Sequence, residues 1–250
     1  MTKRILLFCT LLMCTLITQA QLSIPDLAPA PSVNPIIIHD HYTLSYSEKH
    51  EQAEWVYYYL TPERIKGSVK RTDHFREDPG VLTGSAQLSD YKGSGYDRGH
   101  LCPAADNKQS ISAMDQSFYM SNMSPQAPSF NRGLWKKLEE QFRSWVLEKG
   151  GLYVITAGVL SDQLATIGKN QVSVPQYYYK MAYNPHAQQM VAFLMANSKL
   201  AGPITDYVVT VDSVEAVTGL DFFPGLSDGL EDKLESDFDL AAWELFNAKQ

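Results

Sequence analysis

Apolar and polar positions change their spacing several times along the chain, and each spacing predicts a different element. The segments at 36–47 (IIIHDHYTLSYS) and 53–60 (AEWVYYYL) are rich in β-branched and aromatic residues, so we expect two strands joined by a short polar loop. The run LYVITAGVL at 152–160 predicts a buried strand, and the turn chemistry at 184–186 predicts a hairpin between two apolar segments. These strands indicate a mainly antiparallel sheet.

A helical spacing follows Asn131, where apolar residues recur every three or four positions. The apolar stripe consists of Leu134, Trp135, Leu138, Phe142, Trp145 and Val146. This spacing places the side chains on one face, so we expect a helix that packs on the sheet, with Asn131 as its N-cap. The segment QSFYMSNMSPQ at 116–126 predicts a strand that precedes this helix and carries Asn122.

Two further segments have helical character near the end of the chain. Residues 204–220 begin as a strand and change to helical spacing, with Asp212 or Ser213 as the cap. Residues 228–247 place apolar side chains on one face and many acids on the other, which predicts a solvated amphipathic helix in one or two pieces. Nothing in this pattern marks a boundary, so we expect one α+β domain over residues 37–250.

The segments outside these elements have their own character. Residues 61–95 are polar and glycine-containing and predict loops. Residues 21–36 contain four prolines without periodicity, which predicts an extended leader. Residues 1–20 combine Lys3 and Arg4 with an apolar run that is shorter than the about 20 residues of a membrane span, and they end in Thr-Gln-Ala. We therefore expect a signal peptide that is cleaved after Ala20 and export to the periplasm or beyond.

Charge and cysteine content narrow the function classes. The whole chain carries a formal charge of −7, and loss of Lys3 and Arg4 makes the remaining chain more acidic, which argues against a general polyanion-coating protein. Cys102 is the one cysteine left after cleavage, because the other two of the three lie in the signal segment. An intramolecular disulfide is then impossible, and a small, semi-buried packing role fits Cys102 better than a catalytic thiol does.

The segment YDRGHLCPAAD holds the arrangement that chemistry explains best. Asp97, Arg98, Gly99 and His100 lie in what reads as a turn-like patch. A histidine can activate water near neutral pH, and an arginine holds a phosphate through its planar fork. Gly99 lets backbone and substrate approach closely. This combination suits hydrolysis of a phosphodiester.

A divalent metal would supply the remaining charge compensation. Mg²⁺ usually keeps most of its waters and takes only one or two protein oxygens. Asn131 can offer an amide oxygen, and Glu139 lies eight positions later on nearly the same helix face. Glu139 can accept hydrogen bonds from water bound to the metal. His39 and His41 form a second candidate metal fragment, but no third ligand of matching spacing follows, and an alternating strand face explains both.

The segments YDRGHLCPAAD, FYMSNMSPQ and FNRGLWKKLEE resemble the DNA/RNA non-specific endonucleases, a ββα-metal (His-Me finger) family, and the likeness extends over most of residues 37–225. The resemblance implies an α+β fold with that active-site motif and a Mg²⁺ cofactor for which Mn²⁺ is a substitute. It also implies roles for individual residues. These are His100 as general base, Arg98 as phosphate contact, Asn131 as the direct protein ligand of the metal, Glu139 as partner of its waters, and Asn122 as support for the site. A further upstream arginine contacts phosphate in the family, for which Arg71 fits best and Arg76 is the competitor.

The resulting expectation is an exported, Mg²⁺-dependent endonuclease that cuts DNA and RNA with little sequence preference and leaves 5′-phosphate ends. Two alternatives remain: a non-catalytic nucleic-acid-binding or partner-binding module, and a phosphodiesterase of small nucleotides. The presence of His100, Asn131 and Glu139 favours an enzyme over the binding module. A closed pocket instead of an open groove would distinguish the small-nucleotide enzyme. The oligomeric state stays open, a homodimer included, and no membrane partner is expected after cleavage.

Overall fold

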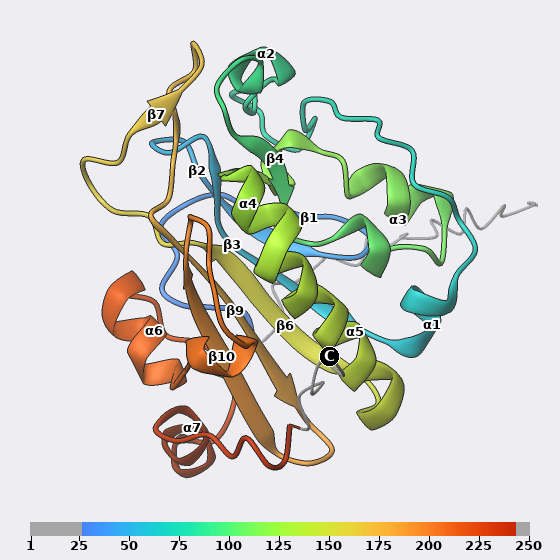
Figure 1. Ribbon diagram of the computed structural model, residues 1–250, viewed down its shortest axis with the longest axis vertical. Helices are drawn as coiled ribbons and strands as arrows, with labels where there is room; N and C mark the ends of the chain where they lie inside the picture. Colours follow the sequence, from blue (N-terminus) through green and yellow to red (C-terminus); the bar gives the residue numbers. More distant parts are fainter. Residues whose placement is uncertain (1–26, 244–250) are drawn as a thin grey trace, which may run out of the picture.

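A seven-stranded antiparallel sheet forms the centre of the computed structural model, which describes residues 27–243 (Figure 1). The strand order is β1-β2-β3-β6-β9-β10-β11, and each neighbouring pair is antiparallel. The strands are β1 (Ile36–Ile38), β2 (Thr43–Ser47), β3 (Gln52–Leu60), β6 (Leu152–Gly158), β9 (Tyr177–Asn184), β10 (Gln189–Ala196) and β11 (Val208–Val209). The predicted α+β class with a mainly antiparallel sheet is confirmed.

Two smaller sheets and several helices complete the described part of the chain. One small sheet pairs β4 (Asp97–His100) with β5 (Met123–Gln126), and the other pairs β7 (Thr166–Ile167) with β8 (Val172–Ser173). The helices are α1 (Pro62–Lys66), α2 (Leu88–Tyr91), α3 (Ile111–Gln116), α4 (Pro128–Phe130), α5 (Lys136–Lys149), α6 (Val211–Thr218) and α7 (Asp228–Glu235). Within residues 27–243, no helix has both the length and the apolar character needed to cross a bilayer.

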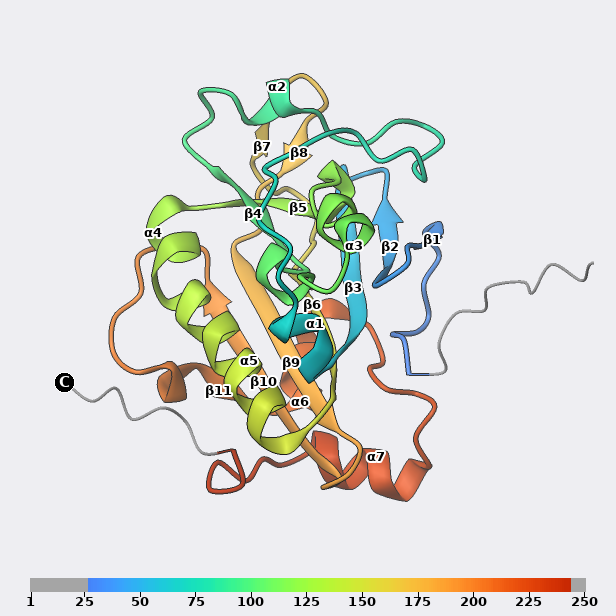
Figure 2. The same cartoon turned by 90° about the vertical axis from the view of Figure 1, so that its right-hand side faces the viewer.

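Helices cover both faces of the large sheet (Figures 1 and 2). On one face, α5 and the turn before it bury the predicted stripe: Trp135, Leu138, Phe142, Trp145 and Val146 are inaccessible to solvent, and Leu134 is partly buried. The Phe142 and Trp145 rings lie 6.1 and 6.3 Å from the ring of Phe193 on β10. Each such side chain contributes about 1.5–3 kcal/mol when fully buried. This packing fixes α5, and with it Glu139, on the sheet.

On the opposite face lie α6, α7 and the segment between them. Val211, Val214, Phe222 and Phe223 pack there with residues of β3, β6, β9 and β10. The residues just before β1 also lie on this face, since Ala28 is buried in the same cluster and Ala30 forms a bridge with Asp221. The predicted leader is therefore in contact with the sheet domain from residue 27 on. The predicted signal peptide lies outside the described residues.

Several sequence-based expectations about strands and loops need correction. His39 and His41 do not share a strand face, because the strand ends at Ile38 and the next begins at Thr43. The long predicted loop at 61–95 contains α1 and α2. Among the three tyrosines at 177–179, the second and third are fully buried as expected, whereas Tyr177 is 47% exposed at the start of β9.

The sequence-based predictions place the helices near the end of the chain correctly but differ from the structure in where these helices begin or end. α6 is capped by Thr210, whose hydroxyl accepts from Ser213 N at 3.2 Å, and not by Asp212 or Ser213. The predicted helix at 228–247 ends at Glu235. Asp237 and Asp239 then accept hydrogen bonds from nearby backbone amides, a local alternative to helical bonding. Residues 244–247 of that prediction lie outside the described chain.

Candidate active site

The central motif forms a two-stranded sheet followed at once by a helix. In β4, Asp97 pairs with Gln126 of β5, and His100 pairs with Met123. The motif is thus a strand and not the expected turn-like patch, because pairing with β5 satisfies its backbone groups. Gly99 is needed for this pairing: a Cβ there would collide with the Gln126 side chain. The packing of β4 against Gln126 therefore accounts for the glycine at this position.

His100 lies against two aromatic rings. Its ring centroid is 5.0 Å from that of Phe118, at an interplanar angle of 90°, and 5.8 Å from that of Phe75. Its Nε2 is buried and has no hydrogen-bond partner within residues 27–243. Burial, assisted by the positive charges of Arg71 and Arg98, lowers the pKa of His100 to about 3. The imidazole is therefore neutral at pH 7 and its Nε2 is not engaged by another side chain.

Two arginines share these aromatic rings with His100. The guanidinium carbon of Arg98 lies 4.2 Å from the centroid of the Phe75 ring, and that of Arg71 lies 4.8 Å from the centroid of Phe118. Arg71 also donates from Nε to Asp73 Oδ1 at 2.6 Å, and its side chain is 52% exposed. Arginine side chains stacked in this way keep donors available for a phosphate. The two cations and the histidine form one cluster.

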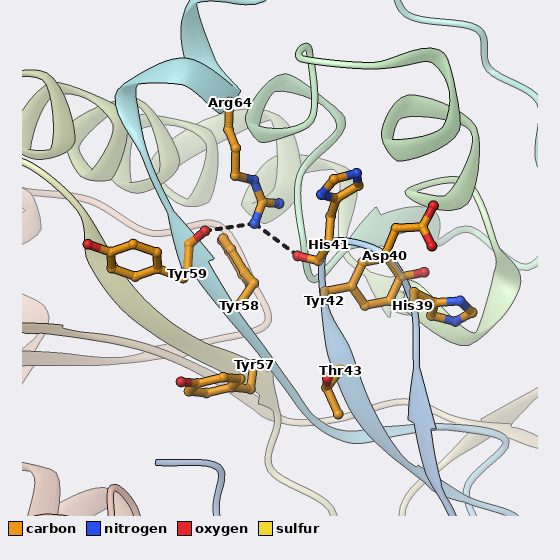
Figure 3. A pocket seen from close by; sticks show the side chains of 9 residues that line it. All are labelled: His39, Asp40, His41, Tyr42, Thr43, Tyr57, Tyr58, Tyr59 and Arg64. Atoms are coloured by element: carbon orange, nitrogen blue, oxygen red, sulfur yellow. Dashed lines mark hydrogen bonds between the residues drawn. The ribbon is translucent and has the colours of Figure 1, made fainter. Parts of the chain in front are cut away.

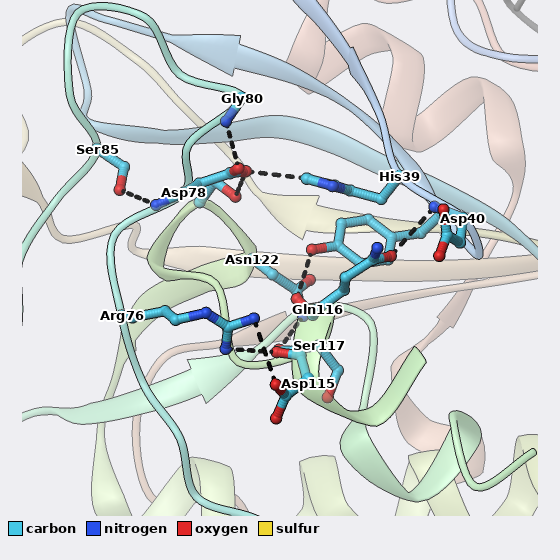
Figure 4. A network of polar contacts seen from close by, with 12 residues as sticks. His39, Asp40, Arg76, Asp78, Gly80, Ser85, Asp115, Gln116, Ser117 and Asn122 are labelled. Atoms are coloured by element: carbon cyan, nitrogen blue, oxygen red, sulfur yellow. Dashed lines mark hydrogen bonds and ion pairs between the residues drawn. The ribbon is translucent and has the colours of Figure 1, made fainter. Parts of the chain in front are cut away.

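The competing upstream arginine is engaged elsewhere (Figure 4). Arg76 NH1 donates to the backbone oxygens of His74 and Asp115 at 3.0 and 2.9 Å, and its guanidinium lies 4.3 Å from the centroid of the Tyr119 ring. These contacts hold the segment before α2 against the end of α3. Geometry therefore favours Arg71 over Arg76 as the arginine beside His100.

Asn131 lies in a wide turn of π type (Asn131–Trp135) between α4 and α5, and not at an N-cap. Its φ and ψ of −54° and −48° are helical, because the helix already begins at Pro128, a residue suited to the first helical position. The backbone then departs from helical geometry at Gly133. Single π turns of this kind occur often at functional sites. The Asn131 side chain points away from the helix and reaches β4.

Asn131 Nδ2 donates to Asp97 Oδ2 at 2.9 Å. Asp97 also accepts from Arg132 Nε at 2.8 Å and Arg132 NH2 at 2.6 Å. Burial opposes ionisation of Asp97, but the hydrogen bonds from Arg132 and Asn131 outweigh it and lower the pKa of this carboxyl. An ionised carboxylate only accepts, so it fixes the Asn131 amide with its nitrogen toward Asp97. The amide oxygen Oδ1 is thereby left for another partner, and an amide oxygen suits a hard divalent cation.

Glu139 lies two turns further along, above a buried charged group. Burial raises the pKa of Glu139 to about 7, while the positive charges of Lys180 and Arg143 oppose the rise. Lys180, on β9, is inaccessible to solvent and donates to Tyr58 Oη at 3.2 Å. Burial lowers the pKa of Lys180, against the influence of Glu139 and Asp106. Asp106 in turn accepts from Tyr58 Oη at 3.1 Å and from Arg143 NH1 at 3.0 Å.

Asn122 lies beneath the site and is inaccessible to solvent. It occupies a 3₁₀ turn (Met120–Asn122) before β5 and not the expected strand, because its side chain bonds the surrounding backbone. Its Oδ1 accepts from Cys102 N at 2.8 Å, and its Nδ2 donates to the carbonyl oxygens of Cys102 and Ser117 at 2.9 and 2.8 Å. This clamp holds the chain that leaves His100. Cys102 itself is fully buried, not semi-buried, and burial raises its pKa to about 11.

The two histidines of the His-x-His pair serve different contacts. His39 Nε2 lies 2.9 Å from Asp78 Oδ2 (Figure 4). His41 borders a surface pocket with Arg64, whose NH1 donates to the His41 and Tyr59 carbonyl oxygens at 2.9 and 2.8 Å (Figure 3). In the described chain, this pair joins no group of three possible metal ligands. The two histidines therefore have structural contacts and no metal-site geometry, and these contacts, not a shared strand face, explain their positions.

The structure therefore arranges the predicted residues in three groups. His100, Arg98 and Arg71 surround the aromatic pair, Asn131 is bonded to Asp97, and Glu139 lies over Lys180. Within residues 27–243, no direct hydrogen bond joins His100 to Asn131, and the two are related through β4. Sequence reasoning missed Phe75, Phe118 and Lys180; a lysine inside the apolar strand YYYKMAY was the available signal for the last.

Comparison with known proteins decides the family. The model of the DNA/RNA non-specific endonuclease family matches residues 26–229. The chain belongs to this family. It is 34% identical to human mitochondrial endonuclease G over 224 residues, which cover 83% of this chain and 73% of the human protein. It is 36% identical over 206 residues to Nuclease C1 of Cunninghamella echinulata var. echinulata, covering 75% of this chain and 82% of the fungal protein.

A solved member of this endonuclease family has the same fold. The crystal structure of the EndoG/EndoGI complex contains a chain that matches with a TM-score of 0.73 and 30% sequence identity, over 79% of this chain and 89% of that one. The protein is thus a non-specific DNA/RNA endonuclease of the endonuclease G and Nuclease C1 type, a phosphodiester hydrolase. The family is metal-dependent, and it implies nucleic acid as substrate.

Proposed function

We propose that this endonuclease is exported, uses Mg²⁺, and hydrolyses DNA and RNA with little sequence preference, with His100 as the general base. The observation that carries the mechanism is the unengaged Nε2 of a neutral His100 beside Arg71 and Arg98. A base must be unprotonated and free of competing partners in order to accept a proton from water. His100 meets both conditions at neutral pH.

The neighbouring groups have complementary tasks. Arg98, held over Phe75, and Arg71, held over Phe118, would bind the phosphoryl oxygens on either side of His100. Their charge also keeps the imidazole unprotonated in the free enzyme. Asn122 acts indirectly, because it fixes the backbone after His100 and has no exposed atoms for the substrate.

Asn131 Oδ1 would hold the metal, and Glu139 would accept hydrogen bonds from the water around it. A bound Mg²⁺ supplies positive charge for the phosphate and for the departing 3′ oxygen, and Mn²⁺ has the same ligand preference for oxygen. The fit rests on Asp97, which takes the nitrogen side of the Asn131 amide and leaves its oxygen side. The ionised form of Glu139 is the one that accepts these hydrogen bonds.

Nucleic acid polymers fit the surroundings of β4 better than small nucleotides do. A hollow beside β4 is lined by Leu88, Tyr91, Lys92, Tyr96, Asp97 and Arg98. It continues from the phosphate-binding arginine toward α2 and offers aromatic and basic groups for neighbouring nucleotides. The test compares supercoiled plasmid, RNA and bis-p-nitrophenyl phosphate as substrates, each with Mg²⁺ and with EDTA. We expect cleavage of both polymers that EDTA abolishes.

Other outcomes would support the alternatives. Hydrolysis of the small diester alone would indicate a small-nucleotide phosphodiesterase, and binding of plasmid without cleavage under several metals would indicate a binding module. Asn131→Ala should lose most of the metal-dependent rate. Export is tested separately by N-terminal sequencing of the protein from the medium or periplasm. A mature N-terminus at Gln21 supports export, whereas an intact protein that starts at Met1 in the cytoplasm contradicts it.

A further inference from the structure

Three acidic side chains meet between α6 and α7, on the sheet face opposite α5. Asp212 and Glu215 belong to α6, and Glu235 is the last residue of α7. One carboxylate oxygen from each of the three lies within 4.8 Å of the other two. Figure 1 shows α6 and α7 away from α4 and α5, and α6 and α5 pack in different core clusters, so this acidic cluster is separate from the active site.

Glu235 is unusual within the cluster, because it is 5% exposed and its Oε1 has no hydrogen-bond partner in the described chain. Glu231, one turn earlier on α7, also carries a buried Oε1 without a partner there. A buried carboxylate without a partner is costly unless a cation or a proton compensates it.

Few positive charges or hydrogen-bond donors of the described residues compensate the negative charge of this acidic cluster. None of the ion pairs found among residues 27–243 involves an acid of this cluster. Glu215 Oε1 accepts one hydrogen bond, from Phe222 N at 2.8 Å, which orients it at the start of the segment that connects the two helices. Asp212 is exposed, so the cluster opens to solvent on one side. An ion can therefore enter from that side.

We propose that Asp212, Glu215 and Glu235 bind a divalent cation, Ca²⁺ in preference to Mg²⁺, which joins α6 to α7. Ca²⁺ binds carboxylate oxygens at about 2.3–2.6 Å, so two of its ligands on opposite sides of the ion are about 4.8 Å apart. The separation of the three oxygens is within this limit. Ca²⁺ also accepts six to eight oxygens in flexible geometry, which leaves room for water on the exposed side.

The site would be structural. The segment between the helices contributes Phe222 and Phe223 to the core on this face, and Phe223 has a positive φ of 60°. A cation that links the two helices on either side of this segment would stabilise it and the β10 face against which α6 and α7 pack. Binding to the folded state alone raises the melting temperature with cation concentration.

The test uses the full mature chain with Asn131→Ala, so that the active-site ligand for metal is removed. Thermal unfolding is measured in EDTA and at increasing Ca²⁺ or Mg²⁺, and Ca²⁺ stoichiometry is measured by isothermal titration calorimetry. We expect one bound Ca²⁺ and a melting temperature raised by about 5–10 °C at a hundredfold excess over Kd, with a smaller rise for Mg²⁺.

The added variants Glu235→Gln and Asp212→Asn should each abolish most of this rise and the calorimetric site. Asp212 is exposed, so its variant tests the site even if Glu235→Gln folds poorly. Asp232→Asn, an exposed acid on α7 outside the cluster, is the matched control and should keep both. Absence of Ca²⁺ binding in the Asn131→Ala chain, or the same Ca²⁺-dependent rise in the Glu235→Gln and Asp212→Asn variants, would overturn the proposal.

Discussion

Asn131 Nδ2 donates to Asp97 Oδ2 at 2.9 Å, a contact that spans 34 residues of sequence and ties the turn before α5 to β4. The same carboxylate receives two hydrogen bonds from Arg132. The contact determines which side of the amide faces the proposed metal site. It therefore relates the strand that carries His100 to the helix that carries the proposed ligand.

Asp97→Ala is expected to weaken the apparent Mg²⁺ affinity in plasmid cleavage by about 10–100-fold, the usual effect of removing a partner that orients a metal ligand. The rate at saturating Mg²⁺ should fall less. Mg²⁺ titration of the initial cleavage rate measures both. Arg132→Gln, which removes the exposed partner of Asp97 but leaves the Asn131 contact, is the control. An unchanged Mg²⁺ requirement in Asp97→Ala would contradict this positioning.

The pH profile at low Mg²⁺ should report Glu139. Its pKa is raised to about 7, so the carboxylate gains a proton, and loses its charge, as the pH falls through 7. The cleavage rate should fall with it. His100, with a pKa of about 3, stays neutral over this range and adds no decrease of its own. Higher Mg²⁺ favours the ionised carboxylate and should move the decrease to lower pH.

Glu139→Gln provides the control for this assignment. It should lower the rate at pH 8 and make the rate nearly independent of pH between 5.5 and 8. If the variant keeps the decrease below pH 7, another group is responsible.

Lys180→Met should shift the same decrease to higher pH. Lys180 is the foremost of the positive charges that hold down the pKa of Glu139, and methionine fills a similar volume without that charge. One pKa unit corresponds to a tenfold change in ionised fraction, so we expect up to about tenfold greater loss at pH 6.5 than at pH 8.5, relative to wild type. Lys136→Met, on the exposed side of α5, should leave the profile unchanged. Equal losses at both pH values would indicate a purely structural role.

Substitution of Arg71 should affect the kinetics of cleavage, whereas substitution of Arg76 should affect the stability of the fold. Arg71→Ala removes a cation beside His100, and we expect a KM for plasmid raised about tenfold with little change in melting temperature. Arg76→Ala removes hydrogen bonds to the carbonyl oxygens of His74 and of Asp115 in α3, and we expect about 1–3 kcal/mol lower free energy of unfolding with a nearly normal KM. Steady-state kinetics and urea unfolding of both variants make the comparison. The reverse pattern would assign the phosphate contact to Arg76.

The sequence predicts those parts of the fold that depend on local periodicity. The α5 stripe is correct because a strong 3.6-residue spacing leaves one way to bury it. The N-cap interpretation of Asn131 failed because the helix already begins at Pro128, and the Asn131 side chain donates to Asp97 of β4 instead of capping its own helix. The predicted strand at Asn122 is wrong because its side-chain amide bonds to backbone groups of Cys102 and Ser117, and the sequence does not predict these contacts.

The sequence does not predict which charged side chains become buried against elements that are distant along the chain. Lys180 is buried because β9 lies beneath α5, and the acids that compensate its charge are Glu139 of α5 and Asp106 of the turn after β4. Glu235 was interpreted as part of a solvated acidic face, yet it is buried where α7 meets α6. The sequence predicts the strand that carries Lys180 and the helix that carries Glu235, but it does not predict which element packs against each of them.

The most direct test of the mechanism is plasmid cleavage in Mg²⁺ by wild type and His100→Ala, with and without added imidazole. Loss of a general base costs about 10²–10⁴ in rate, and a soluble base can replace part of it when the side chain is removed. We predict a loss in this range, binding of plasmid that is retained, and a partial recovery that increases with the concentration of neutral imidazole. A His100→Ala enzyme that cleaves within about tenfold of the wild-type rate would contradict the assignment of His100 as the base.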